Sequence, residues 1–269
     1  MKKTILITAP KGYADRFAEA LSGGLDTNGR CFDPVSLPLI ETDIDTALNN
    51  TADNRPMLKD EDVVVFTSRK AIEAVALSCH RGELSLPSAA TYVAVGKDVE
   101  LMQALLERKQ GFPVCEPSLM GIVEALCRIP RADRKRVVVF GPHVVGMREP
   151  ATVPDFLSAL AHLVGRVCFC PVYTTRAASG AIREALLSRI RQGVDCVAMT
   201  SGGEAQVLSE TLASAPDGLG LLAATQLACF GPFTAKCAKS EGLPVGIVSD
   251  RYHSFRDFAE YLRDHLAWV

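Results

Sequence analysis

The chain lacks any long apolar run and any excess of charge. No apolar stretch approaches the ~18 residues that a membrane-spanning helix needs. The 29 basic and 31 acidic residues leave a net charge of −2, so neither nucleic acid nor an anionic membrane is favoured as a partner. The apolar run near the start is only Ile5–Ile7, which predicts a first strand rather than a signal peptide.

The chain also lacks the patterns of disulfide, metal and nucleotide sites. Its nine cysteines are an odd number without a CxxC, and its five histidines show no metal-ligand spacing. We therefore expect reduced structural thiols, a cytoplasmic location and no metal. No GxGxxG follows a predicted strand, and neither GxxxxGK[ST] nor GxSxG occurs. Dinucleotide binding, nucleotide hydrolysis and a nucleophile elbow are therefore not indicated.

What the chain does have is an internal repeat, offset by about half its length. VVVFTSRKAIEAV (Val63–Val75) matches CVAMTSGGEAQVL (Cys196–Leu208), which aligns Ser68 with Ser201. Pro10 of ITAP matches Pro142 of VFGP at nearly the same offset. A twofold repeat predicts two similar lobes, and two lobes usually form a cleft.

Apolar runs of strand length alternate with helical patterns along both halves of the chain. The predicted strands are 4–8, 62–66, 92–95, 113–116, 136–140, 166–170, 196–199, 226–230 and 245–248. The predicted helices are 13–21, 69–78, 98–108, 121–129, 153–163, 178–192, 203–213, 234–241 and 254–267. This alternation predicts two doubly wound α/β lobes, each with a parallel sheet covered on both faces.

Ligands of such sheets lie beyond the carboxyl ends of the strands, where five strand-to-helix turns are expected. These turns are Thr67-Ser68-Arg69, Gly96-Lys97-Asp98, Gly141-Pro142, Thr200-Ser201-Gly202-Gly203 and Gly231-Pro232-Phe233-Thr234. Free backbone N–H groups and the positive ends of helices suit an anionic ligand there.

Each candidate also has a structural interpretation. The two T-S turns are equally explained as helix N-caps, and Gly96 and Gly231 as tight turns. Tyr173 is either a packed aromatic residue with a hydrogen-bonded hydroxyl or a phenol that faces the cleft and donates a proton.

Taken in order and spacing, eight segments resemble the uroporphyrinogen-III synthase family over nearly the whole chain. They are ITAP, SLPLIET, DVVVFTSRKAIEAV, YVAVG, RVVVFGP, PVYTT, DCVAMTSGGEAQVL and CFGPFTAKCAKSEGLPV. The resemblance implies a lyase that cyclises hydroxymethylbilane to uroporphyrinogen III, with loss of water, inversion of ring D and no cofactor. It implies two lobes joined by a two-strand linker, one at 1–37 plus 172–269 and the other inserted at 38–171. The crossings then fall at Pro38 and Pro171, and we expect a cytoplasmic monomer.

The resemblance also implies roles for individual residues. Tyr173 matches the tyrosine that assists departure of the substrate hydroxyl. The implied substrate-binding residues are Thr67, Ser68, Arg69, Gly96, Lys97, Thr200, Ser201, Gly202, Gly231, Phe233 and Thr234. Three positions depart from the family pattern, namely Ala9, Val99 and Gly203. On those sides, contacts are expected from backbone N–H groups or from Lys11, Arg69 or Lys97.

Two other classes of function fit a two-lobed pattern. One is a periplasmic-type binder of small molecules, against which stand the missing signal peptide and the number of free thiols. The other is an inactive regulatory module for a polyanionic small molecule, which Val99 and Gly203 leave open. Turnover discriminates between them, because a binder holds a tetrapyrrole without changing the isomer formed.

Overall fold

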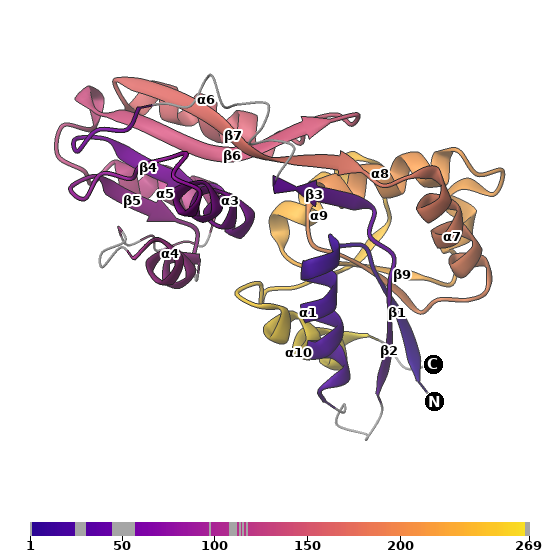
Figure 1. Ribbon diagram of the computed structural model, residues 1–269. Coiled ribbons are helices and arrows are strands. Elements are labelled where there is room, and N and C mark those ends of the chain that lie inside the picture. The colour runs from indigo at the N-terminus through magenta and orange to yellow at the C-terminus, as the bar shows by residue number, and fades with distance from the viewer. Residues whose placement is uncertain are drawn as a thin grey trace. The chain divides into compact units, whose positions relative to one another are not determined.

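The computed structural model describes residues 2–24, 31–44, 57–96, 98–107, 112, 114, 116 and 118–266. These residues form two five-stranded sheets (Figure 1). The chain divides into two compact units, unit 1 being Met1–Glu41 with Arg176–Val269 and unit 2 being Thr42–Thr175. The boundaries implied by the family resemblance fall four residues earlier at both crossings. No described helix is long and apolar enough to cross a membrane.

The sheet of unit 1 has the order β10-β9-β8-β1-β2, and its strands pair in parallel. The strands are β1 (Lys3–Ile7), β2 (Phe32–Ser36), β8 (Cys196–Met199), β9 (Gln226–Cys229) and β10 (Val245–Val248). The helices are α1 (Lys11–Ser22), α7 (Gly180–Arg191), α8 (Gly202–Ala213), η3 (Gly218–Leu222), α9 (Pro232–Ser240) and α10 (Phe255–His265). The parallel pairing confirms the fold class predicted from the apolar runs.

The core of unit 1 explains why its strands are apolar throughout. All four residues of β8 are buried, so this strand is covered on both faces. On one face α1 packs beside α10, where the rings of Phe17 and Phe258 stack with centroids 5.0 Å apart (Figure 1). On the other face, Leu6 and Val197 are completely buried as well.

The sheet of unit 2 has the order β3-β7-β6-β4-β5, and β4 pairs in parallel with both β5 and β6. The strands are β3 (Ile40–Asp43), β4 (Val63–Phe66), β5 (Thr91–Ala94), β6 (Arg136–Val145) and β7 (Arg166–Ala177). The helices are α3 (Arg69–His80), α4 (Asp98–Leu106), α5 (Leu119–Leu126), η2 (Ala132–Arg134) and α6 (Thr152–Leu163).

Two separate core clusters cover the two faces of this second sheet. Val64 and Phe66 of β4 face a cluster that includes Ile72 of α3 and Met102 of α4. The alternate side chains of β4 face a cluster that includes Ile122 of α5 and residues of α6. Alternating side chains therefore bury both faces, as a parallel strand within an α/β layer requires.

The strand orders confirm the internal repeat. The run β9-β8-β1-β2 of unit 1 corresponds to β5-β4-β6-β7 of unit 2, with β8 and β4 each followed by a T-S turn. The chain passes between the units within β3 and again within β7, which are neighbouring strands of one sheet. Pro38 lies just before β3, and Pro171 lies inside β7.

The turn predicted at Gly141-Pro142 is wrong. β6 continues through both residues to Val145, whereas after the matching Pro10 the helix α1 begins at once. The predicted strand 166–170 likewise continues to Ala177. The reason is that β6 and β7 are long neighbouring strands, and this nonlocal pairing overrides the local turn signal of Gly-Pro.

Three further strand assignments differ or remain untested. The apolar pattern predicts neither β2 nor β3: FDPVS of β2 contains Asp and Pro, which strands disfavour, and β3 is the short polar segment IETD, where only the family resemblance implied a linker strand. Proline is tolerated in β2 because that strand is at the sheet edge. The strand predicted at 113–116 falls where positions 113 and 115 lie outside the described residues.

Candidate active site

The two T-S turns each begin a helix, one in each unit. Ser68 is the N-cap of α3, and its Oγ accepts a hydrogen bond from the Ala71 N–H at 3.3 Å. Ser201 caps α8 in the same way, accepting from the Glu204 N–H at 3.4 Å. The N-cap interpretation of both turns is therefore confirmed. Capping leaves each serine hydroxyl with a hydrogen to donate, because the cap uses only a lone pair.

Tyr173 lies beside the first of these caps. Its phenol oxygen is 3.0 Å from Ser68 Oγ, and either atom can be the donor. The Tyr173 side chain, on β7, is 7% exposed and belongs to the core of unit 2. Burial raises the pKa of Tyr173 to about 12, and the hydrogen bond with Ser68 opposes that rise. The phenol is therefore protonated at neutral pH and has a proton to give.

Thr67 is held at the end of β4 by the neighbouring strand β6. Its N–H and its Oγ1 each donate to the carbonyl oxygen of Phe140 at 3.1 Å. A Cβ on Gly141 would lie 2.7 Å from the ring of Phe169 and 3.1 Å from Thr67 Oγ1. Phe169 is 36% exposed. An accessible aromatic ring therefore lies close to Thr67, in a space that only glycine at 141 leaves open.

Arg69 and Gly96 are placed at the starts of α3 and α4. Arg69 forms an ion pair with Asp98, with Nε 3.4 Å from Oδ1, and these are the first residues of the two helices. Gly96 has a φ of 51°, a left-handed conformation that favours glycine. The ion pair ties the two helix N-termini together. The predicted contact Lys97 lies outside the described residues.

In unit 1 the T-S turn encloses a buried carboxyl group, that of Glu204, which is completely buried. Glu204 Oε2 accepts from the Thr200 N–H at 2.9 Å, and Oε1 accepts from Thr200 Oγ1 at 2.7 Å and Ser201 Oγ at 2.9 Å. Thr8 Oγ1, at the end of β1, is 2.7 Å from Oε2. The carboxyl group thus joins the ends of β1 and β8.

Thr234 is attached to the same turn. α9 has Gly231 as its N-cap and Pro232 as its first residue, the position where proline is favoured. The Thr234 hydroxyl donates to the Thr200 carbonyl oxygen at 3.1 Å, and the Thr234 side chain is 6% exposed. Phe233 beside it is 41% exposed.

The structure therefore gathers the predicted residues into one group in each unit. In unit 2 the group is Thr67, Ser68 and Tyr173, and Arg69 and Gly96 lie at adjoining helix starts. In unit 1 the group is Thr200, Ser201 and Thr234, with Gly202 as the first residue of α8 and Gly231 as the cap of α9.

Glu204 was missed by the sequence analysis. A signal for it exists in the sequence, since Ser201 and Glu204 have the S-x-x-E spacing of a capping box. In that motif the glutamate accepts from the backbone N–H of the cap residue itself. Here it accepts instead from Thr200, one residue earlier. The sequence pattern could have located the residue, but not its complete burial.

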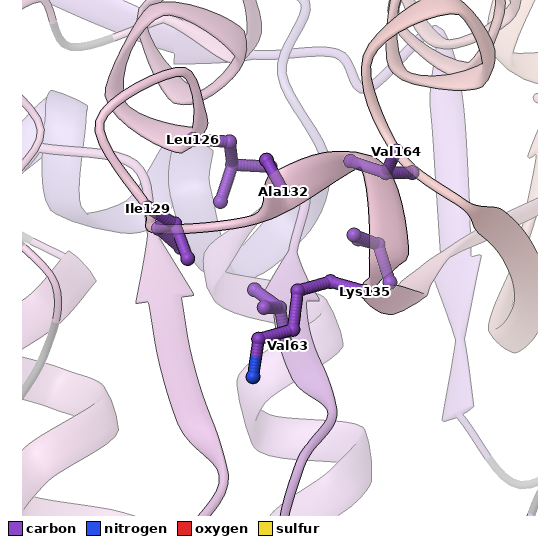
Figure 2. A pocket seen from close by; sticks show the side chains of 7 residues that line it. Val63, Leu126, Ile129, Ala132, Lys135 and Val164 are labelled. Carbon is purple, nitrogen blue, oxygen red and sulfur yellow. The ribbon is translucent and has the colours of Figure 1, made fainter.

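Other binding features are weak in the described residues. A shallow hollow in unit 2 is lined by Val63, Leu126, Ile129, Ala132, Lys135, Val137 and Val164, and Figure 2 shows its mostly apolar side chains. It is smaller than a usual ligand pocket and lies at the amino end of β4, opposite the T-S turn. No group of three His, Cys, Asp or Glu residues in this part of the chain is placed to share a metal ion.

Comparison with known proteins gives one family. Residues 19–256 match the family model described as HEM4: Uroporphyrinogen-III synthase HemD. A mutant uroporphyrinogen III synthase from the extremely thermophilic bacterium Thermus thermophilus is 17% identical with a TM-score of 0.59, covering 98% of this chain and 100% of that one. Uroporphyrinogen-III synthetase from Helicobacter pylori is 12% identical with a TM-score of 0.49, covering 92% of each chain. The likeness to the Thermus thermophilus protein shows a shared fold. Among curated proteins, none matches the chain.

Proposed function

The chain belongs to the uroporphyrinogen-III synthase HemD family, and from that premise we propose that Tyr173, oriented by Ser68, is its proton donor and that Thr200, Ser201 and Thr234 help to bind its substrate. The chain accordingly works in tetrapyrrole biosynthesis as a cyclising lyase that acts on a small tetrapyrrole. We propose that the substrate is hydroxymethylbilane, which closes to uroporphyrinogen III with loss of water and inversion of ring D.

The single observation that carries the catalytic assignment is the pair of Tyr173 and Ser68. The phenol keeps its proton at neutral pH, and the serine hydroxyl 3.0 Å away fixes its direction. In our proposal Tyr173 donates this proton as the carbon–oxygen bond of the hydroxymethyl group breaks, so that the hydroxyl leaves as water. Loss of a proton from the pyrrole that closes the ring then restores the proton balance. One positioned acid gives on the order of 10² in rate.

The remaining groups are proposed to bind the acidic side chains of the tetrapyrrole. Helices α3, α8 and α9 begin at predicted site turns in their own units, and their N-termini favour anions. The backbone N–H groups that follow Ser68 and Ser201 and the guanidinium of Arg69 lie at these helix starts. In this proposal each unit binds carboxylates at the carboxyl ends of its own strands.

Such a site is suited to positioning rather than to difficult chemistry. The substrate loses its hydroxyl readily from an electron-rich pyrrole and closes unaided to the uninverted isomer. The proposed task is therefore to present the substituted carbon of the last ring to attack, which gives a spiro intermediate before the ring inverts. Orientation of this kind supplies large rate factors without a strong acid or base.

The test is an isomer assay. Hydroxymethylbilane is generated in situ, the products are oxidised, and type I and type III uroporphyrins are separated by chromatography. Type III that scales with the amount of protein is expected. Type I alone, formed at the spontaneous rate while the protein is folded, would contradict the proposal and favour a binding protein.

Two finer properties are also proposals. We expect a monomer, which sedimentation of the purified protein tests directly. We also expect a cytoplasmic protein, because all eight cysteines in the described residues are free thiols, as in a reducing compartment.

A further inference from the structure

Glu204 is a buried carboxyl group to which the reaction above assigns no task. Its partners come from two separate strand ends: Thr8 follows β1, while Thr200 and Ser201 follow β8. All of these partners are hydroxyls or a peptide N–H, so none carries a compensating positive charge. A buried, ionised carboxylate is costly without such a charge.

The hydrogen bonds around Thr8 accommodate a neutral carboxyl group. Thr8 Oγ1 lies 3.1 Å from the Ala198 carbonyl oxygen and 2.7 Å from Glu204 Oε2. A hydroxyl has one hydrogen, and a carbonyl oxygen can only accept. If Thr8 donates to Ala198, Glu204 must carry the hydrogen of the shorter bond. A protonated Oε2 then donates to Thr8 and still accepts from the Thr200 N–H.

Burial also favours the neutral form of the Glu204 carboxyl group. It raises the pKa of the Glu204 carboxyl group above its ordinary value, and the hydrogen bonds with Thr200, Thr8 and Ser201 oppose that rise without cancelling it. Neutrality matters for an acidic ligand, because an ionised carboxylate beneath the N-terminus of α8 would repel a second carboxylate bound there.

Glu204 also controls a residue that it does not touch. It bonds to the N–H and the Oγ1 of Thr200 and to the Oγ of Ser201, so it holds the chain on both sides of the Thr200 carbonyl. That carbonyl oxygen accepts the hydroxyl of Thr234 at 3.1 Å. Movement of the Thr200 peptide would therefore displace Thr234 and the start of α9 as well as the start of α8.

We propose that Glu204, as a neutral carboxyl group, is a positioning residue that sets the Thr200–Ser201 turn and Thr234 to receive a carboxylate of the tetrapyrrole. This proposal rests on the binding role given to those three residues above. It adds a residue that acts through them, and it assigns the chemical form in which that residue acts.

The test compares two variants of Glu204. In Glu204→Gln the amide oxygen can accept from the Thr200 N–H and from Thr8, while the NH₂ group donates to the hydroxyls of Thr200 and Ser201. We expect a KM for hydroxymethylbilane within about 3-fold of the original protein. Glu204→Met keeps the approximate volume and removes every one of these bonds. We expect its KM to rise about 10- to 100-fold, with a smaller change in kcat.

Thr211→Val is the matched control. Thr211 is buried in the same helix, and its hydroxyl donates to the Val207 carbonyl oxygen within that helix. This variant also removes a buried hydroxyl from α8, but it should leave KM unchanged. Circular dichroism and thermal unfolding of all variants separate altered binding from unfolding.

The outcomes divide clearly. A folded Glu204→Met with an unchanged KM would overturn the positioning role, and a Glu204→Gln as impaired as Glu204→Met would overturn the neutral form. If Glu204→Met does not fold, Thr8→Val removes one bond to the carboxyl group and should raise KM about 3- to 10-fold; an unchanged KM there would count against the proposal.

If the original protein forms no type III isomer, the proposed reaction fails. The affinity of each variant for uroporphyrin III, followed by fluorescence, then tests Glu204 independently and should show the same order.

Discussion

The phenol oxygen of Tyr173 lies 3.0 Å from Oγ of Ser68, the residue that also caps helix α3. Ser68 accepts from the Ala71 N–H and has capacity left for Tyr173, so the cap holds the hydroxyl in a defined place. The tyrosine comes from β7 and the serine from the end of β4, and β6 lies between these strands. Two strands of one rigid sheet therefore fix the relative position of the two hydroxyls.

The first prediction concerns removal of this phenol. Tyr173→Phe should lower kcat for formation of the type III isomer by about 10- to 10³-fold, because it removes the proposed acid. The cost in stability should be about 1 kcal/mol, the usual worth of one hydrogen bond between neutral groups. The isomer assay gives kcat, and urea unfolding gives the free energy of unfolding.

The matched control is Tyr92→Phe. Tyr92 is another buried tyrosine of unit 2, and its hydroxyl donates to the Pro87 carbonyl oxygen away from the T-S turn. This variant should lose similar stability and keep its full kcat. Full activity in a folded Tyr173→Phe would remove the acid role and leave Tyr173 as a packed aromatic residue.

The second prediction concerns the space beside Thr67. Gly141→Ala places a Cβ 2.7 Å from the Phe169 ring and 3.1 Å from Thr67 Oγ1, so one of them must move. Phe169 is partly exposed and can swing outward, so the loss of stability should stay below about 1 kcal/mol. We expect kcat/KM to fall about 3- to 10-fold, because Thr67 is at the proposed binding turn.

The control for this variant is Gly180→Ala, since a Cβ at the start of α7 meets nothing within 4 Å. It should leave kcat/KM unchanged. Adding Phe169→Ala to Gly141→Ala removes the contact with the ring but not the 3.1 Å approach to Thr67 Oγ1, so kcat/KM should stay below that of Phe169→Ala alone. Unchanged kcat/KM in Gly141→Ala would mean that the position of Thr67 does not matter for the reaction.

The sequence was sufficient to predict the buried inner strands of the two sheets. β4 and β8 read VVVF and CVAM, and such unbroken apolar runs identify parallel strands covered on both faces. The length of β6 could not be read in this way. Gly141-Pro142 has the local pattern of a turn, and it stays extended because of the neighbouring strand β7, whose sequence begins more than 20 residues later.

The site residues also divide into those that a local sequence pattern predicts and those that only long-range contacts bring together. Ser68 and Ser201 were identified because a cap residue directly after a strand is a local pattern. The approach of Tyr173 to Ser68 spans 105 positions and that of Thr8 to Glu204 spans 196, so no local pattern predicts either. Burial decides the chemical form of Glu204, and burial is a property of the folded chain.

The third prediction concerns the buried ion pair at the amino ends of β4 and β6 in unit 2. Asp62 is 1% exposed and bonds to Arg136, whose Nε is 2.8 Å from Oδ1. Burial raises the pKa of Asp62, but the hydrogen bonds from Arg136 and from the Lys59 N–H, with the charge of Arg136, outweigh it, so the pKa lies below its ordinary value. Asp62→Asn should cost about 2 kcal/mol at neutral pH, because it leaves a mostly buried guanidinium without its counterion.

A depressed carboxyl pKa stabilises the folded state only above the value of the unfolded chain. The stability due to Asp62 is therefore present above about pH 4 and is lost as the pH falls through the folded-state pKa. Glu41→Gln is the control, since Glu41 and Arg176 form an exposed pair that should contribute less than about 0.5 kcal/mol. Urea unfolding at pH 7 measures both variants. Equal losses would contradict the importance of burial for the Asp62 pair.

The last prediction concerns Glu204, whose pKa shift has the opposite direction to that of Asp62. Its pKa is raised in the folded state by burial, so the folded chain holds the proton more tightly than the unfolded chain does. The resulting stabilisation is fully present below the ordinary glutamate pKa of about 4.3 and is lost as the pH rises through the higher folded-state value. Asp62 and Glu204 thus act at opposite ends of the pH range, and only Glu204 loses stabilisation when the pH rises.

Glu204→Gln isolates this effect, because glutamine can bond to the same partners and cannot ionise. The difference in the free energy of unfolding between the original protein and Glu204→Gln should move in favour of the variant as the pH rises from 4 to 8, by urea unfolding at each pH. Cys229 is the other titratable group that senses Glu204, and burial raises its pKa to about 12, so it stays neutral throughout this range. Glu210→Gln, an exposed change on the same helix, is measured in parallel as the control. A flat difference for Glu204→Gln would mean that Glu204 titrates in the folded chain as it does in the unfolded one, and the turn at Thr200 would then stand over an ionised carboxylate.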